Sequence, residues 1–354
     1  MRRNTKYIKT KHLNKKNMKR IYTIVMAAAA CRSMTSCGGN GAAKSAEGDA
    51  AADNKLPIGL QLYSIRDDMA KDFKGTLQKV KDMGYDGVEF AGLYDNTPEQ
   101  VKAMCDEIGL VPVSAHVPLA DMLADIDKVI ADYKAIGCQY IVVPYVTEER
   151  RPGGELFMQM IDEIRTIGQK VKDAGMTLLY HNHDFEFTKL EDGQYGLDYL
   201  YANVPADLLQ TELDECWVKY SGEDPVAYLK KYAGRSPLVH IKDFYAEGKQ
   251  EGDPYALIGL NEGEQKKAGT FEFRPLGEGL QDIPAIIKAA EESGSKWLIV
   301  EQDDPSMGKT PMECVTMSIN YLKDNYINCS GDCSTEDCAA CPESKSCEGC
   351  PEAK

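Results

Sequence analysis

Apolar runs alternate with amphipathic stretches over residues 56–326. Eight of the runs are short and have the composition of strands. They are IGLQLYSI, GVEFAG, VPVSAH, YIVVPY, TLLYHNH, LQTELDE, LVHIKD and WLIVEQD. Helical periodicity fills the intervals, and residues 119–137 and 157–175 each end in the glycine expected after a helix. A final helix is expected over residues 311–326, because Pro311 suits a first helical turn.

Eight strands alternating with helices predict an α/β fold, a single (β/α)8 TIM barrel over residues 56–326. A doubly wound open sheet would produce a similar alternation. The GxGxxG motif that dinucleotide-binding sheets carry after their first strand is absent from this position. We therefore expect the barrel.

The first 37 residues have the pattern of an export signal. Nine of the first 20 residues are Lys or Arg, and the apolar run IYTIVMAAAA and then MTSCGGN follow. The apolar run is too short to span a bilayer. Small residues before Cys37 resemble a bacterial lipoprotein cleavage box, so Cys37 is the expected lipidation site; Cys31 and an unprocessed basic arm are the alternatives. The expected location is that of an exported, membrane-anchored lipoprotein on the periplasmic side of a Gram-negative bacterium.

Two further segments lack the composition of a folded core. Residues 38–55 hold almost no large apolar side chains and predict a flexible linker. Residues 327–354 form an acidic tail with six cysteines, four of them spaced C-x2-C-x5-C-x2-C. That spacing suits a metal or an iron–sulfur cluster, but export favours disulfides or a disordered tail.

Net charge restricts the partners of the protein. The chain carries a formal charge of −15, and removal of residues 1–36 would leave −25. A field of this sign repels phosphate backbones, which excludes nucleic acid as a partner. The expected contact with a membrane is through the lipid anchor alone. Self-association into a homo-oligomer is left open.

Imidazole and carboxylate side chains gather where the predicted strands end. The chain has five histidines, and four of them lie at strand ends: His116, His181, His183 and His240. Four acidic residues share this placement: Glu89, Asp214, Asp243 and Glu301. In a TIM barrel the active site lies at these ends. Each residue alone could be an ordinary rim residue, but oxygen and nitrogen donors together suit a divalent ion, Mn²⁺, Co²⁺, Zn²⁺ or Mg²⁺.

Six segments carry a resemblance to a known family: LQLYSIRD, GYDGVEFAG, SAHVPL, LVHIKD, PLGEGLQD and LIVEQD. Together they resemble the sugar phosphate isomerase/epimerase family, which has a xylose isomerase-like TIM barrel. The resemblance covers residues 57–326 and implies one divalent metal held by side chains of strands five to eight. Carried over, the ligands are Asp214, His240 and Glu301. The family commonly has a glutamate in a LEN setting on strand five, where YHNH places His181, so His181 is the expected fourth ligand. Glu186 is the alternative if its loop turns back.

The resemblance also implies a reaction, proton removal next to a carbonyl. Glu301 is one expected base, with His181, His183 or Glu186 as the group opposite it; His183 and Glu186 are the expected catalytic residues. Glu89, His116 and Lys242 are expected to bind substrate, with a rim salt bridge as the alternative for Lys242.

The expected function is therefore a metal-dependent isomerase or epimerase that works through an enediolate. Its expected substrate is an unphosphorylated sugar or keto-sugar, because sugar phosphates are mainly cytosolic. One alternative is a lyase or dehydratase acting on a 3-keto-glycoside or related keto-sugar, since the His-rich fifth strand is similar to that of the inosose dehydratase branch. The other alternative is a non-catalytic sugar-binding lipoprotein.

Overall fold

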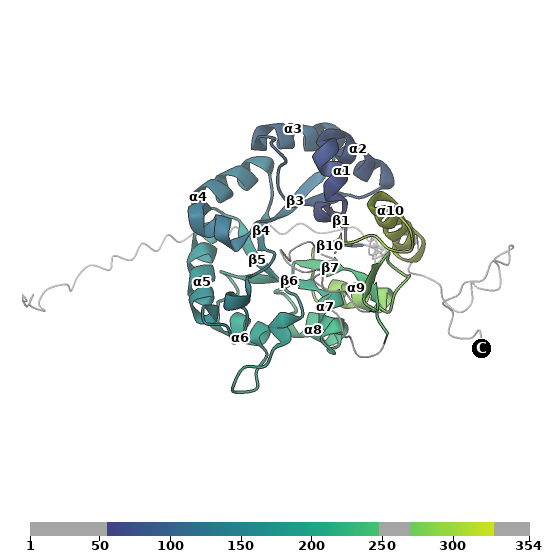
Figure 1. Cartoon of the computed structure of the whole chain (residues 1–354). Coiled ribbons are helices and arrows are strands. Elements are labelled where there is room, and N and C mark those ends of the chain that lie inside the picture. Colours follow the sequence, from purple (N-terminus) through teal and green to yellow (C-terminus); the bar gives the residue numbers. More distant parts are fainter. Residues whose placement is uncertain (1–54, 248–269, 329–354) are drawn as a thin grey trace, which may run out of the picture. The chain divides into compact units, whose positions relative to one another are not determined.

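Eight parallel strands close into a barrel (Figure 1). This computed structural model describes residues 55–247 and 270–328. Around the barrel the strands follow the order β1, β10, β7, β6, β5, β4, β3, β2. Their bounds are β1 Ile58–Gln61, β2 Gly87–Phe90, β3 Val111–His116, β4 Tyr140–Val143, β5 Thr177–His181, β6 Gln210–Asp214, β7 Leu238–Ile241 and β10 Trp297–Val300. The predicted TIM barrel is thus confirmed.

Helices surround the barrel and cover its outer face (Figure 1). They are α1 Arg66–Lys71, α2 Phe73–Met83, α3 Pro98–Ile108, α4 Leu119–Ile136, α5 Phe157–Asp173, α6 Gly196–Asn203, α7 Glu215–Tyr220, α8 Pro225–Lys231, α9 Ile283–Glu292 and α10 Pro311–Leu322. Their apolar faces pack on the strands in one large core, because a parallel barrel must bury both faces of its sheet.

Some strands and helices differ from the predicted ones because of local hydrogen bonds and backbone conformation. The end of IGLQLYSI forms a 3-10 helix over Leu62–Ile65, since the Gln61 side chain accepts the Tyr63 N–H and turns the chain. Helix α4 contains a kink at Asp125, whose backbone is non-helical. Two short strands after β7 were not predicted. These strands, β8 Asp243–Tyr245 and β9 Glu272–Arg274, form an antiparallel pair beside the barrel.

Inside the barrel, apolar side chains come first along the strands, and polar side chains follow at the strand ends that form the barrel mouth. The apolar cluster consists of Val113, Tyr140, Val142, Leu179, Leu238 and Ile299. Residues two positions apart on a strand face the same side. Three members of this cluster are accordingly followed by inward-facing polar residues: His181 after Leu179, His240 after Leu238 and Glu301 after Ile299. Strand periodicity thus aims these three side chains into the barrel mouth.

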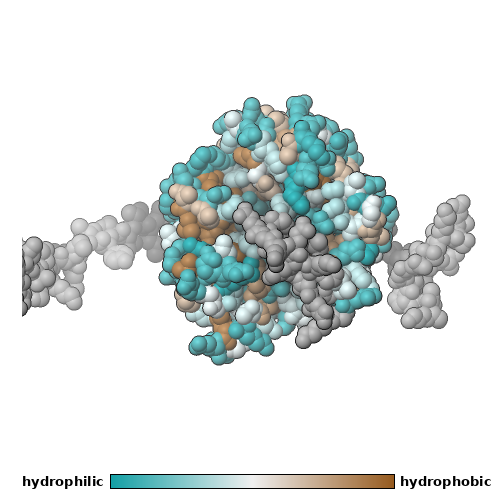
Figure 2. Space-filling view, in the orientation of Figure 1, coloured by the Kyte–Doolittle hydropathy of each residue, from teal (hydrophilic) through white to brown (hydrophobic). Residues whose placement is uncertain are grey.

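The surface seen in Figure 2 is mainly hydrophilic, with hydrophobic patches on the side where α4 and α5 lie. Leu123 and Met158 are among the exposed large hydrophobic residues of these two helices. Within the described ranges no helix is long and apolar enough to cross a membrane. The expected signal segment with Cys37 lies outside the described residues, as do nearly all of the expected linker and tail. Lipid anchoring therefore stays a prediction.

Candidate active site

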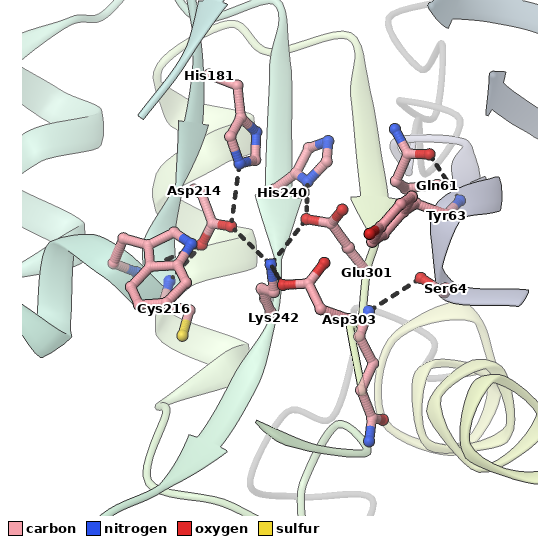
Figure 3. A network of polar contacts seen from close by, with 12 residues as sticks. Gln61, Tyr63, Ser64, His181, Asp214, Cys216, His240, Lys242, Glu301 and Asp303 are labelled. Carbon is pink, nitrogen blue, oxygen red and sulfur yellow. Dashed lines mark hydrogen bonds and ion pairs between the residues drawn. The ribbon is translucent and has the colours of Figure 1, made fainter. Parts of the chain in front are cut away.

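Four buried side chains from consecutive barrel positions converge at the mouth. His181 ends β5, Asp214 ends β6, His240 lies on β7 and Glu301 follows β10. Each offers one potential ligand atom, and these atoms lie within 4.8 Å of one another. Figure 3 shows His181 turned toward Asp214 and His240 turned toward Glu301. Their facing atoms, His181 Nε2 with Asp214 Oδ2 and His240 Nδ1 with Glu301 Oε2, are 3.5 and 3.0 Å apart.

This donor set fits a divalent metal. Two imidazole nitrogens and two carboxylate oxygens are ligands that Zn²⁺ and Mn²⁺ accept, and all four side chains are buried. The four are those proposed from the sequence, and the structure brings them together. Their role as ligands stays a prediction.

The ends of β5 and β6 are locked together beneath this group. Asn182 accepts the Asp214 backbone N–H at 3.0 Å and donates its side-chain amide to the Asp214 carbonyl at 3.2 Å. Asp214 also caps α7, since its Oδ1 accepts the backbone N–H of Cys216. Its Oδ2 is the atom that faces His181. The carboxylate is thus oriented from two directions.

Lys242 places an ammonium group among three carboxylates (Figure 3). Its Nζ lies 2.6 Å from Asp303, 2.9 Å from Glu301 and 3.4 Å from Asp214. Burial alone would raise the pKa of Glu301, but Lys242 and His240 outweigh it and hold that pKa well below its usual range. Glu301 is therefore ionised. Lys242, a predicted substrate contact, lines the cavity and also neutralises its carboxylates.

A second polar layer lies below, toward the barrel floor. Glu89 has its two oxygens hydrogen-bonded to Gln61 and Ser114, at 2.7 Å each. Glu212, which the sequence reasoning missed, lies 2.7 Å from His116 through its Oε2. Burial would lower the pKa of His116, yet Glu89 and Glu212 raise it to about 10. The period of two on β6 could have found Glu212, because it shares the inward face of Asp214.

The two alternatives after strand five are placed differently. Both oxygens of Glu186 are engaged away from the site: Oε1 accepts from the Tyr180 hydroxyl at 2.6 Å and Oε2 from the His183 backbone at 2.8 Å. Glu186 belongs to neither potential metal group of the described residues. Its burial raises its pKa to about 8. His183 instead lines the cavity, with its ring stacked on Phe185.

A cavity of about 410 Å³ opens above the metal group. The predicted site residues that line it are His116, His181, His183, Lys242 and Glu301. Glu89, the third predicted substrate contact, is fully buried and is not among the lining residues. The lining also contains Tyr63, Asp121, Tyr145 and Asp303, which were not proposed from the sequence. Asp303 could have been noticed as the residue two positions after Glu301.

Comparison with known families connects this geometry to a superfamily of enzymes. Residues 77–324 match the family model described as xylose isomerase-like TIM barrel. The chain belongs to this family. The family membership expected from the six sequence segments is thereby confirmed.

Individual relatives are similar to this protein over parts of its chain. An inosose dehydratase of Clostridium beijerinckii is 30% identical over 171 residues, which cover 47% of this chain and 53% of that protein. The chain thus spans about half the length of the curated relative it matches. A crystal structure of a sugar phosphate isomerase/epimerase from Parabacteroides distasonis has a TM-score of 0.61 at 24% identity, covering 79% of this chain and 97% of that one. The IolI protein with a bound zinc atom has a TM-score of 0.56 at 17% identity, covering 76% and 97%. Both structural likenesses show the fold alone.

Proposed function

We propose that this protein is a metal-dependent lyase that acts on an unphosphorylated keto-sugar or keto-glycoside. The reaction removes a proton next to the carbonyl and expels an oxygen substituent from the following carbon. The chain retains a buried acid–base set at the barrel mouth, which binding alone would not require. Similarity to an inosose dehydratase supports elimination over the isomerase reading preferred from the sequence.

The observation that carries the proposal is the asymmetry of the acid–base pair. Glu301 is an ionised carboxylate, whereas Glu186 is turned away from the cavity and bonded to Tyr180 and the His183 backbone. Reversible epimerisation favours two groups of similar basicity on the two faces of one carbon. Here the group that accompanies Glu301 in the cavity is His183, an imidazole. A pair of different groups suits elimination, in which one abstracts and the other protonates.

The proposal gives Glu301 and His183 separate tasks. Glu301 Oε2 is engaged by Lys242 and His240, which leaves Oε1 to take the C–H proton. Strands β6 and β7 separate β5 from β10, so His183 and Glu301 approach the cavity from different sides. Burial, together with the Lys242 ammonium, lowers the pKa of His183, so the ring is neutral and presents an N–H.

Elimination then balances as follows. The C–H proton moves to Glu301, a carbon–carbon double bond forms beside the carbonyl, and the bond from the next carbon to oxygen breaks. The departing oxygen takes the N–H proton of His183 while the second ring nitrogen takes a proton from solvent, so the ring stays neutral, and Glu301 returns its proton to solvent. A divalent ion held by His181, Asp214, His240 and Glu301 would supply Lewis acidity for the negative charge that develops on the carbonyl oxygen.

The charge of the cavity supports a substrate without phosphate. Its lining includes Asp121, Glu301 and Asp303, and the Lys242 ammonium already contacts two of these carboxylates. TIM barrels often bind phosphate through backbone N–H groups of loops after strands seven and eight. In this protein the N–H groups of residues 277, 279 and 281 donate to the Asp243 carboxylate at 3.0–3.1 Å. The Asp243 carboxylate thus occupies the backbone N–H groups that would otherwise be available to bind a phosphate.

The test is a product assay with the full chain loaded with Mn²⁺ or Zn²⁺. A methyl 3-keto-glycoside and its 6-phosphate are incubated in D2O. We expect an enone, detected by ultraviolet absorbance and NMR, from the first compound and little from the second. Glu301→Gln should lose both C–H exchange and enone, whereas His183→Asn should keep the exchange and lose the enone. An epimer that carries deuterium, with no enone, would contradict the proposal.

An epimerase is the second candidate. It is favoured by the fold-level likeness to the Parabacteroides distasonis isomerase/epimerase. The same assay separates the two, because a two-base epimerase lacking His183 should exchange deuterium yet form little inverted product.

A further inference from the structure

The two candidate ligand histidines present opposite ring nitrogens to the carboxylates. His181 faces Asp214 through Nε2, at 3.5 Å, whereas His240 faces Glu301 through Nδ1, at 3.0 Å. Figure 3 shows the second nitrogen of each ring directed away from that carboxylate. A metal among these four residues would therefore meet Nε2 of one histidine and Nδ1 of the other.

Glu212 lies next to both remaining nitrogens. Its Oε2 is 3.1 Å from His181 Nδ1 and 3.2 Å from His240 Nε2. Glu89 adds a second acceptor for His240, with Oε1 at 2.8 Å from Nε2. All of these side chains are buried, with Glu89, Glu212 and His240 at 0% exposure.

With a metal ion bound among the four candidate ligands, this arrangement determines which ring nitrogen carries the proton. A neutral imidazole has one N–H, and a carboxylate beside one nitrogen holds the N–H there and leaves the lone pair on the other. Carboxylates flank both nitrogens of His240, so a bound metal makes the choice by taking the lone pairs of His181 Nε2 and His240 Nδ1. The single N–H of each ring then lies on His181 Nδ1 and His240 Nε2, where ionised Glu212 accepts it. The lone pairs then face Asp214 and Glu301, where a metal would bind.

His116 allows two carboxylates to lie together in this layer. Its Nε2 is 2.7 Å from Glu212 Oε2 and 3.0 Å from Glu89 Oε1. A shared N–H between these oxygens offsets their mutual repulsion, and the ring stacks on His240 with an interplanar angle of 9°. Both carboxylates are thereby kept in place under the ligand rings.

We infer that Glu212 is a positioning residue that fixes opposite tautomers of His181 and His240 for the metal, with Glu89 as the second acceptor for His240. The inference rests on the proposed function only in taking these histidines as metal ligands. It gives Glu89 a role beneath the metal group.

The same residues offer a competing explanation. His116, His181, Glu212 and His240 also bring potential ligand atoms within 4.8 Å of one another, so a second ion could bind at the floor. In that case the floor-facing nitrogens would bind metal and could not be donors. Metal stoichiometry and the tautomers together distinguish the two arrangements.

The first test measures tautomers directly in the zinc-loaded full chain labelled with 15N-histidine. Long-range 15N–1H correlation spectra should show Nδ1–H at His181 and Nε2–H at His240, with one zinc per chain. Assignment uses His181→Gln and His240→Gln spectra. The inference is overturned by the same tautomer at both residues, by no N–H at either, or by two zinc ions per chain.

The second test compares zinc affinity among three glutamine variants. Glu212→Gln should weaken zinc binding about 10–100-fold, as is typical when an outer partner of a metal ligand is lost. Glu89→Gln should weaken it less, because Glu212 remains beside His240. The matched control is Glu215→Gln, which alters a buried carboxyl group that adjoins Asp214 and, within the described part of the chain, accepts no hydrogen bond.

Zinc dissociation constants come from chelator competition, and Co²⁺ absorption spectra report the ligand geometry. Glu215→Gln should keep both at wild-type values. Equal weakening by Glu212→Gln and Glu215→Gln would show a general effect of altering a buried carboxyl group and would overturn the inference. If Glu212→Gln does not fold, the tautomers of the wild-type chain still decide. Both readouts need no substrate, so the absence of lyase activity would refute the proposed function alone.

Discussion

The two halves of the barrel mouth differ in chemistry. Strands β5, β6, β7 and β10 provide all four candidate metal ligands and the lysine among their carboxylates. In the other half, strands β1, β2 and β3 provide Gln61, Glu89, Ser114 and His116, most of which lie in the lower polar layer. Of these four, His116 alone lines the cavity. The comparison favours the second half as the place of the proposed chemistry, with Glu212 of β6 beneath its histidines, whereas Glu89 and His116 of the first half support that layer and His116 also forms part of the opposite wall.

The largest expected effect comes from the second half. Asp214→Ala, His240→Ala and Glu301→Ala should each lose the metal and, with it, activity by more than the roughly 100-fold seen when an outer partner is removed. The metal content of purified variants, by mass spectrometry, checks this, with circular dichroism as the control for folding. Normal metal content in all three would remove the distinction between the halves.

The metal content of two further variants distinguishes the two candidate ligands associated with strand five, His181 and Glu186. His181→Ala should lose the metal and Glu186→Gln should keep it, because Glu186 has both oxygens engaged elsewhere. The reverse result would show that Glu186 is a metal ligand and that His181 is not.

Much of this division could be predicted from the sequence. Strand-end histidines are rare enough to notice when a chain has five histidines in all, and strand periodicity aims them inward. What the pattern could not provide is the direction in which a side chain turns after its strand has ended. Glu186 follows β5 by five positions, and a 3-10 helix over Phe185–Phe187 turns it into the core. The sequence reasoning missed Glu212 because this residue lies within β6, two positions before its last residue, Asp214. A carboxylate at such a position is easily taken for a core residue whose hydrogen bonds are satisfied.

A smaller effect is expected from Lys242, whose ammonium balances the second half. Lys242→Met leaves Asp214, Glu301 and Asp303 buried together without their cation. Removal of one partner from a buried ion pair costs about 3–5 kcal/mol. We expect that loss in the free energy of unfolding of the metal-free chain at pH 8, measured by urea denaturation. A saturating divalent metal should recover part of it, because the ion supplies positive charge to two of the same carboxylates. An unchanged metal-free stability would mean that these carboxylates are not ionised together.

The smallest expected effect lies in the first half. Asp121, on α4, lines the cavity and is exposed, so its charge is screened by solvent and salt. If this half is a wall for an uncharged sugar, Asp121→Asn should change kcat/KM for a methyl 3-keto-glycoside by less than about fivefold, the range of exposed charge interactions. The change should appear in KM and leave kcat alone, because an exposed wall residue contacts substrate without taking part in proton transfer. The same variant should improve binding of the 6-phosphate at low salt, since a repulsive charge is gone, and the improvement should fade as salt is added. A large fall in kcat would instead make Asp121 part of the chemistry and extend the reacting site across both halves of the barrel.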